Sequence, residues 1–185
     1  KQPDSKSKIY ANCLIVDFME TLQKPLLVLD IDETLLHSTW EQLNQQADFC
    51  YKGRKVYLRP HLHDFMDFCF QHFTVGIYSS AKAEYAKYLL KKVVGDLNKF
   101  HFIRTRAHCR KIYKNEGWGD MEIYLKDLTL LTDYQPDTSF MVDDQTSTVH
   151  PLDAVVIVDE YRGCKHDDEL LLLKEDLLKL LPKSL

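Results

Sequence analysis

The segment "LLVLDIDETLLH", Leu26–His37, joins a continuous apolar run to three closely spaced carboxylates. An apolar run without alternation is typical of a strand that is buried on both faces of a parallel sheet. Asp30, Asp32 and Glu33 then follow, with Thr34 directly behind them. A single Asp after a strand is most often a turn residue or a helix cap. Three acids together therefore need an explanation from the rest of the chain.

The apolar run has four counterparts later in the sequence. Further β-rich segments occupy residues 73–78, 100–104, 139–142 and 154–158. Segments with apolar residues at helical spacing follow Pro60 and Ser80, and a leucine-rich segment closes the chain. Strands that alternate with helices predict an α/β fold with a central, mainly parallel sheet and right-handed crossovers.

Local signals refine this pattern. Proline favours the first turn of a helix, so Arg59-Pro60 predicts a helix start, and Lys52-Gly53 predicts the turn of a short hairpin within an insertion at 38–58. The two internal helices are expected to bury one face each, made of Leu62, Phe65, Met66 and Cys69 in the first and of Tyr85, Leu89 and Val93 in the second. Residues 1–8 are polar and predict a disordered or linker segment, a helix is favoured over 9–22, and 9–185 is expected to form one domain.

The bulk composition excludes several classes of protein. The chain has 185 residues with a net charge of −4, so general binding to a nucleic-acid backbone is not expected. Its apolar runs are too short to span a bilayer. The five cysteines are scattered and odd in number, which argues against a disulfide framework and favours an intracellular, reducing compartment. The histidines and cysteines do not form two ligand pairs at the spacing of a zinc site, so no zinc site is expected. The protein is expected to be a monomer.

Polar side chains follow three of the predicted strands. Asp30 ends the first, Ser79 ends the second, and Asp143 and Asp144 end the fourth. Ligands of parallel sheets bind where the carboxyl ends of the strands meet. Clustered carboxylates are unfavourable unless a cation neutralises them, and their hard oxygens suit Mg²⁺, which in turn suits a phosphate substrate. Bacterial receiver domains use similar parts, but there the acidic pair precedes the nucleophile, and here it follows.

Four motifs resemble one family. "DIDET" (30–34) resembles the D-x-D-x-T motif of the haloacid-dehalogenase (HAD) superfamily, and with "LRPHLHDF" (58–65), "YLKDL" (124–128) and "MVDD" (141–144) it resembles the RNA polymerase II C-terminal-domain phosphatases. The resemblance runs from Leu26 to about Leu181. It implies a HAD-like Rossmannoid three-layer sandwich with a small β-hairpin insertion and no large cap.

The resemblance also implies catalytic roles. Asp30 would be the nucleophile that forms an aspartyl-phosphate, and Asp32 would be the general acid and then the general base. Thr34 would orient Asp32 or its loop, Ser79 would hydrogen-bond a phosphate oxygen, and Lys126 would stabilise negative charge on the phosphoryl group and on Asp30. A Mg²⁺ site would be built from Asp30, Asp32 (through its backbone carbonyl), Asp143 and Asp144, with Asp144 favoured as the direct ligand of the pair.

Substrate contacts are expected from three residues. Arg106 lies in "RTRAHC", where the relatives carry a phosphate-contacting arginine, and Tyr85 matches a residue of their proline pocket. Lys82 stands where some of them have an aliphatic residue, which argues against specificity for proline beside the phosphoserine. Around Arg106, a local positive patch would steer phosphopeptides toward this acidic protein. Its further members are Arg104, Arg110, Lys111 and Lys114.

We therefore expect a Mg²⁺-dependent phosphatase that acts on phosphoserine or phosphothreonine in proteins. The resemblance makes RNA polymerase II tail peptides the leading substrate class. It also implies a nuclear location, with the cytoplasm as the alternative. Two other functions stay open. One is a HAD phosphatase for small metabolites or nucleic-acid ends. The other is a non-catalytic HAD-like binding module resembling the mitochondrial import subunit, although Asp30 and Asp32 are both present.

Overall fold

A central parallel sheet organises the fold. The computed structural model describes residues 24–115 and 120–181, so the predicted linker at 1–8 and helix at 9–22 lie outside the described residues. The sheet has five strands in the order β11-β9-β1-β5-β6, all parallel to their neighbours. The α/β fold with a central parallel sheet is thus confirmed. The strand bounds are β1 Leu26–Leu29, β5 Thr74–Tyr78, β6 Phe102–Arg104, β9 Ser139–Asp143 and β11 Val155–Ile157.

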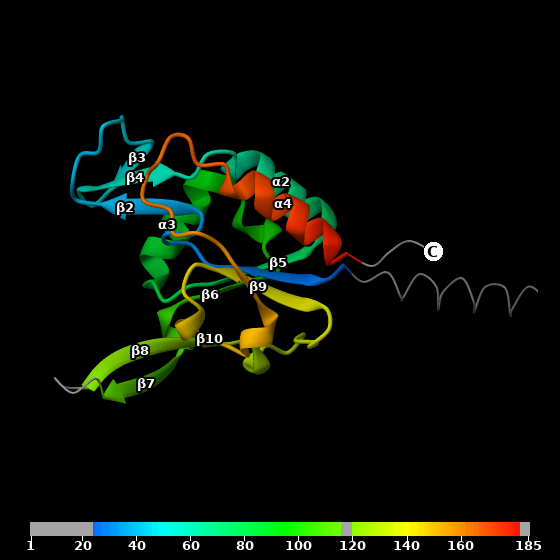
Figure 1. The fold of residues 1–185 in the computed structure, drawn as a ribbon. Helices are drawn as coiled ribbons and strands as arrows, with labels where there is room; N and C mark the ends of the chain where they lie inside the picture. Colours follow the sequence, from blue (N-terminus) through cyan, green and yellow to red (C-terminus); the bar gives the residue numbers. More distant parts are fainter. Residues whose placement is uncertain (1–23, 116–119, 182–185) are drawn as a thin grey trace, which may run out of the picture.

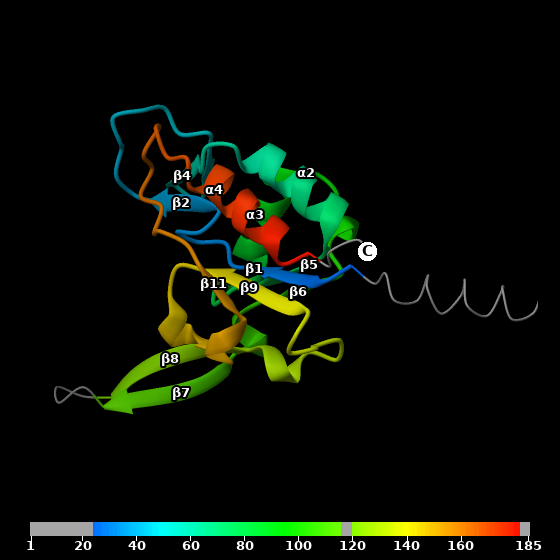
Figure 2. The same cartoon turned by 45° about the vertical axis from the view of Figure 1, so that its right-hand side comes forward.

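Three α-helices cover one face of this sheet (Figures 1 and 2). They are α2 (Leu62–His72), α3 (Ala83–Val94) and α4 (Glu169–Lys179). Leu27 and Leu29 of β1 point into the core beneath them and are fully buried. The predicted apolar face of α2 is buried as expected, and α3 buries Leu89 and Val93. No helix in the described part of the chain is long and apolar enough to cross a membrane.

The opposite face of the sheet is covered differently. There Val28 and Met141 pack against short 3₁₀ turns and strand β10 (Val149–His150) rather than against α-helices of the described chain. Gly76 of β5 leaves room for this layer, because a Cβ at that position would lie 2.3 Å from the ring of Phe102. The three-layer arrangement is therefore present, with its second outer layer made of turns and short strands.

The insertion after the first motif forms a small sheet of its own. Its strands are β2 (Leu36–Thr39), β3 (Phe49–Tyr51) and β4 (Arg54–Leu58), in the order β2-β4-β3. The predicted turn at Lys52-Gly53 is confirmed, and both residues have positive φ, 47° and 87°, as a two-residue hairpin requires. Strand β2 was not predicted, because its sequence "LHST" is polar and yet largely buried.

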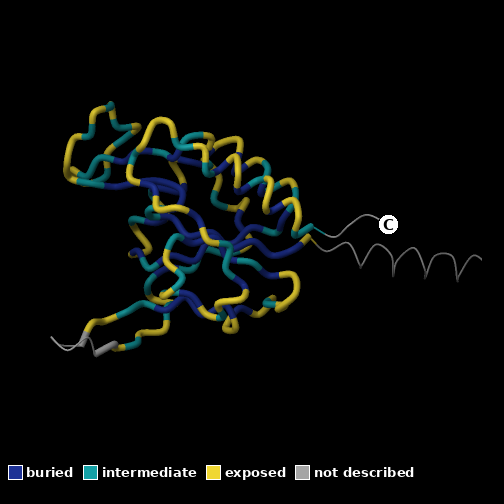
Figure 3. Tube along the Cα trace, viewed as in Figure 1, coloured by how far each residue is buried: buried dark blue, intermediate teal, exposed yellow. Residues whose placement is uncertain are grey.

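A second hairpin, absent from the sequence-based expectations, projects from the opposite end of the molecule (Figure 1). Strands β7 (Arg110–Asn115) and β8 (Asp120–Asp127) pair antiparallel, and β8 also pairs with β10. Figure 3 shows that much of this hairpin is exposed, whereas buried residues concentrate along the central strands. Its alternation of polar and apolar residues lacks the continuous apolar run that identified the other strands. The end of β8 nevertheless carries Lys126 into the interior.

Buried Arg59 ties the insertion to the end of the chain. Its Nε and Nη2 donate to the two carboxylate oxygens of Asp167 at 2.8 and 3.0 Å, and its Nη1 donates to the carbonyl of Thr34 at 3.1 Å. The guanidinium also lies over the Tyr161 ring, 5.4 Å from its centroid. A planar guanidinium with paired acceptors is the geometry that makes Arg irreplaceable by Lys at such sites.

We expect Arg59→Leu to lower the free energy of unfolding by about 3 kcal/mol, because removal of one partner leaves Asp167 and the Thr34 carbonyl without their buried donor. Urea denaturation of the two proteins measures the difference. Lys179→Leu, which removes an exposed ion pair with Asp176, is the control and is expected to change nothing measurable. Equal stability of Arg59→Leu and the wild type would show that this anchor contributes little.

Candidate active site

The polar strand ends predicted to meet do lie on adjacent strands. Asp30 follows β1, Ser79 follows β5, and Asp143 is the last residue of β9 with Asp144 next to it. Strand β1 pairs with β5 on one side and with β9 on the other, all parallel. The carboxyl ends of the three strands therefore share one edge of the sheet, which brings these side chains into one region.

Lys126 reaches this edge from outside the central sheet. Its Nζ lies 2.8 Å from Oδ1 of Asp30 and 2.6 Å from Oδ2 of Asp143, and the side chain is 4% exposed. Pairing of β8 with β10, which matches Lys126 with Val149, sets its position. Burial alone would lower the pKa of Lys126, but the charges of the two carboxylates outweigh it and raise the pKa. The ammonium group is thus held charged between them.

Three carboxylates in this cluster suit a divalent cation. Ligand oxygens of Asp30, Asp143 and Asp144 all lie within 4.8 Å of one another. Oδ1 of Asp30 is buried and, although near Lys126, has no partner in hydrogen-bond geometry. Burial raises the pKa of Asp30 to about 8, against the opposing effect of Lys126. A hard cation such as Mg²⁺ would satisfy the unused oxygen and favour the ionised form, so the donor set fits the predicted metal.

The hydroxyl of Thr34 contacts a carboxylate that the resemblance did not assign to it. Its hydroxyl donates to Oδ1 of Asp144 at 3.0 Å, whereas the resemblance assigned it to Asp32 or its loop. The side chain is fully buried, and its carbonyl is fixed by Arg59. The contact aims the carboxylate of Asp144 at the cluster, which supports the preference for Asp144 as a direct metal ligand.

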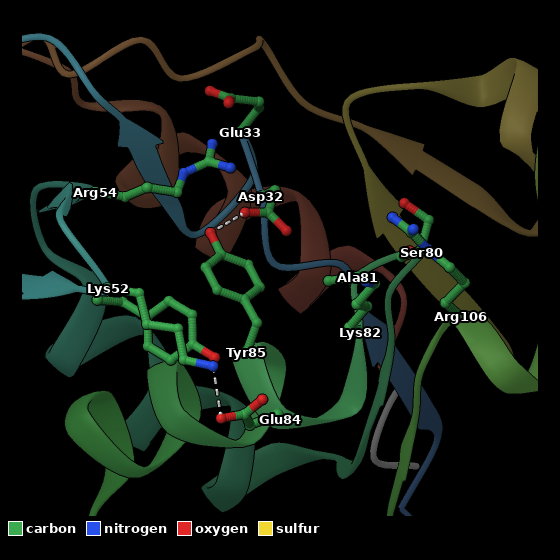
Figure 4. Close-up of a pocket in the computed structure, with 11 residues that line it drawn as sticks. Asp32, Glu33, Lys52, Arg54, Ser80, Ala81, Lys82, Glu84, Tyr85 and Arg106 are labelled. Carbon is green, nitrogen blue, oxygen red and sulfur yellow. Dashed lines mark hydrogen bonds and ion pairs between the residues drawn. The ribbon is translucent and has the colours of Figure 1, made fainter.

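Asp32 faces away from the lysine cluster toward a pocket. Oδ1 of Asp32 accepts a hydrogen bond of 2.6 Å from the hydroxyl of Tyr85 on α3 (Figure 4). Burial raises the pKa of Asp32, while the hydrogen bond from Tyr85 lowers it. The next residue, Glu33, has a φ of 61°, and its carboxylate is 2.6 Å from Nδ1 of His37. The chain thus turns directly after Asp32, and the two aspartates of the motif lie in different environments, Asp30 against Lys126 and Asp32 against Tyr85.

The remaining predicted residues line the same region. Oγ of Ser79 accepts from the backbone N–H of Ala81 at 3.0 Å, which orients the hydroxyl at the end of β5. Nε of Arg106 donates to the carbonyl of Ser80 at 2.6 Å. Lys82 is exposed and precedes α3. Arg106 and Lys82 both line the pocket that contains Asp32.

Sequence reasoning missed Arg54 as a pocket residue. It begins β4, and its side chain enters the pocket from the hairpin side (Figure 4). The Lys52-Gly53 turn was the available signal, since it fixed the hairpin that carries Arg54. Nothing in the spacing linked this arginine to Asp32, because the small sheet folds back onto the site only in three dimensions.

Comparisons with known proteins show which sequences and folds this chain is similar to. The family model described as "NLI interacting factor-like phosphatase" matches residues 25–184. A Caenorhabditis elegans protein named "CTD small phosphatase-like protein 3" is 29% identical over 154 residues, which cover 80% of this chain and 51% of that protein. The chain therefore spans about half the length of this relative.

Two other similarities bear on fold and function. The solved structure of the fission yeast RNA polymerase II CTD phosphatase Fcp1 superposes with a TM-score of 0.57 at 15% identity, covering 91% of this chain and 54% of that one. At this identity the match concerns the fold alone, and it confirms the HAD-like class. A Debaryomyces hansenii protein named "Mitochondrial import inner membrane translocase subunit TIM50" is 28% identical over 153 residues, or 78% of this chain and 30% of that protein.

Proposed function

The chain belongs to the family of NLI interacting factor-like phosphatases, and on this premise we propose that it hydrolyses phosphoserine or phosphothreonine in proteins through an aspartyl-phosphate on Asp30. The observation that carries the proposal is the cluster in which Lys126 lies within 2.8 Å of Asp30 and within 2.6 Å of Asp143, beside Asp144. Well-packed apolar residues often stabilise a fold at least as well as buried charges do. A purely structural role therefore does not explain why these charges are buried here.

In the first half of the proposed reaction, a carboxylate oxygen of Asp30 attacks phosphorus and the bond from phosphorus to the serine oxygen breaks. Asp32 donates its proton to that leaving oxygen, and the hydroxyl of Tyr85 holds its carboxyl group in place. Lys126 lies against Asp30 and neutralises charge that develops on the transferring group.

In the second half, Asp32 accepts a proton from the water that attacks the aspartyl-phosphate, which restores Asp30 and releases phosphate. Ser79 and Arg106 are proposed to hold the phosphoryl oxygens during both halves. Asp30, Asp143, Asp144 and the carbonyl of Asp32 would hold Mg²⁺, which when bound neutralises phosphoryl oxygens and favours an ionised Asp30. Thr34 would fix Asp144 for this purpose.

The substrate class follows from the surroundings of the site. In the described part of the chain no large cap covers the pocket, whose lining comes from the small hairpin, α3 and the segment at Arg106. A phosphate on a polypeptide can enter such a site from solvent. Because relatives carry names such as "CTD small phosphatase-like protein 3", peptides of the RNA polymerase II tail are the leading candidate substrates, and the nucleus is the proposed location. We also propose that the protein acts as a monomer.

The test is phosphate release by the purified chain from phosphoserine peptides, phosphothreonine peptides and p-nitrophenyl phosphate. Release that requires Mg²⁺ and stops with EDTA is the expected result. Activity that survives EDTA would contradict the metal site. Release from sugar phosphates or from 5′-phosphorylated oligonucleotides but from no phosphopeptide would favour the metabolite or nucleic-acid alternative instead.

A non-catalytic binding module is the second candidate function, and the similarity to TIM50 favours it. Retention of both Asp30 and Asp32, with Asp30 against a buried lysine, argues against it. The two functions differ in a single-turnover assay with excess enzyme, which would detect even slow chemistry. A chain that binds phosphopeptides and never releases phosphate would establish the binding module.

We expect Tyr85→Phe to lower kcat/KM on phosphoserine peptides about tenfold, because Asp32 loses the hydroxyl that positions it. The loss should be smaller for p-nitrophenyl phosphate, whose leaving group needs little protonation. Steady-state kinetics on both substrates gives the comparison. Tyr88→Phe on the same helix, where the lost hydrogen bond goes to the carbonyl of Cys50, is the control. An equal loss on both substrates would assign Tyr85 a purely structural role.

A further inference from the structure

The pocket beside Asp32 has more capacity than one phosphate requires. It encloses about 510 Å³, a volume typical of sites for sizeable ligands. One wall is the β3–β4 hairpin with Tyr51 and Arg54, another is the start of α3 with Lys82 and Tyr85. Figure 4 shows Asp32 between these elements, with Arg54 and the hydroxyl of Tyr85 on its hairpin side. The proposed reaction gives roles to Asp32, Tyr85 and Arg106 of this lining and none to Arg54.

The net charge of the pocket lining is opposite in sign to the net charge of the whole chain. The net charge of the protein is −4. In contrast, the lining contains four cationic side chains and three carboxylates. The cations are Lys52, Arg54, Lys82 and Arg106, and the carboxylates are Asp32, Glu33 and Glu84. The pocket is therefore locally positive in an acidic protein, as an anion-binding surface is.

The carboxylates of the lining are already engaged by protein groups. Asp32 accepts from Tyr85 at 2.6 Å, and Glu33 lies 2.6 Å from Nδ1 of His37. Glu84 pairs with Nζ of Lys52 at 2.9 Å. An entering anion would therefore meet carboxylates that are each bound by a protein donor.

The remaining cations are not engaged in this way. Within residues 24–115 and 120–181, no carboxylate forms an ion pair with Arg54, Lys82 or Arg106. Arg54 donates one hydrogen bond within the described residues, from its Nη2 to the carbonyl of Ser38 at 2.7 Å. Its buried Nε has no acceptor there. In Figure 4, Arg54 and Arg106 lie on opposite sides of Asp32. The two arginines thus approach Asp32 from different sides of one pocket, Arg54 from the β3–β4 hairpin and Arg106 from the segment after β6.

We propose that Arg54 forms a second anion site on the hairpin side of the pocket, with Lys82 on the α3 side adding to its positive field, and that this site binds a carboxylate or a second phosphate carried by a residue near the phosphoserine. The inference rests on the proposed phosphatase function and specifies its substrate. The partly buried guanidinium of Arg54 supplies directed, charge-assisted hydrogen bonds, and the exposed ammonium of Lys82 supplies long-range attraction. Substrates are then acidic around the phosphoserine.

The test compares phosphoserine peptides that differ at one position. Alanine, proline, aspartate or a second phosphoserine is placed one or two residues before or after the reacting phosphoserine, and kcat/KM is measured for each. We expect the wild type to prefer the best acidic peptide over its alanine counterpart by about tenfold, with the preference falling at high salt. The aspartate and phosphoserine arms tell a carboxylate from a phosphate ligand.

The variants are judged by this ratio and not by overall activity. Arg54→Met, Lys82→Met and the double variant are expected to reduce the preference in steps toward unity. A purely structural effect would lower kcat/KM for acidic and alanine peptides alike and leave the ratio intact. Lys91→Met, an exposed lysine later on the same helix, is the matched control and should keep the full preference.

The outcomes separate this inference from the function on which it rests. If the wild type hydrolyses phosphopeptides with no acidic preference at any position, or if the double variant keeps the preference, the second anion site is wrong and the phosphatase stands. If the wild type hydrolyses none of them, the proposed function fails. The affinities of the acidic and alanine peptides, measured by calorimetry, then decide the site, and equal affinities overturn it.

Discussion

Replacement of Asp30 by Asn is expected to lower kcat on phosphoserine peptides by at least about 10⁴-fold, because an amide cannot form the aspartyl-phosphate. Asn keeps the size of the side chain, so the loss reports chemistry more than packing. Burial opposes the charge of Asp30 and raises its pKa to about 8. A neutral amide at this position removes the cost of burying that charge, and Lys126 keeps its ion pair with Asp143, so the fold should stay intact, with an unfolding temperature no lower than that of the wild type by more than a few degrees.

Two controls make this result interpretable. Asp67→Asn changes an exposed residue of α2 and is expected to keep full activity. Rapid quenching of the wild type with a ³²P-labelled peptide should trap label on the protein, and the Asp30→Asn protein should trap none. Substantial turnover by Asp30→Asn, or label trapped on it, would assign the nucleophile to another residue.

The sequence carried most of what identifies the site. The continuous apolar runs of β1, β5 and β9 located three strands, and the polar residues directly after them located Asp30, Ser79, Asp143 and Asp144. Because β1, β5 and β9 pair in parallel, the residues that follow them lie on one edge of the sheet. This placement depends only on the direction and order of the strands. These features are local in sequence, which is why they were predictable.

Features that depend on distant packing were not predictable in the same way. Lys126 was assigned through a motif alone, because its strand belongs to a hairpin without a continuous apolar run. The contact of Thr34 with Asp144 joins residues 110 positions apart, and the anchor from Arg59 to Asp167 joins residues 108 apart. Arg54 reaches the pocket only because the small sheet folds over it. No spacing rule connects such pairs, so their roles appear only with the fold.

Lys126→Met is expected to lower kcat about 10³-fold, because no other cationic side chain forms an ion pair with Asp30 in the described part of the chain. The substitution should also lower the stability of the metal-free protein strongly. The variant leaves Asp30 and Asp143 buried without their shared ammonium group, and removal of one partner from a buried ion pair typically costs about 3 kcal/mol or more. Met preserves the length and apolar stem of lysine, so packing changes little.

A divalent cation offers the way to separate charge from packing in this variant. Without Lys126, Asp30, Asp143 and Asp144 have lost their main neutralising group, so Mg²⁺ should raise the unfolding temperature of Lys126→Met by more than it raises that of the wild type. Lys111→Met, which breaks an exposed ion pair with Glu122, is the stability control and should show the wild-type increment. If Mg²⁺ gives Lys126→Met no larger increment than the wild type, its instability reflects lost packing. The lysine would then not be what balances the carboxylates, and the charge argument for this cluster would be wrong.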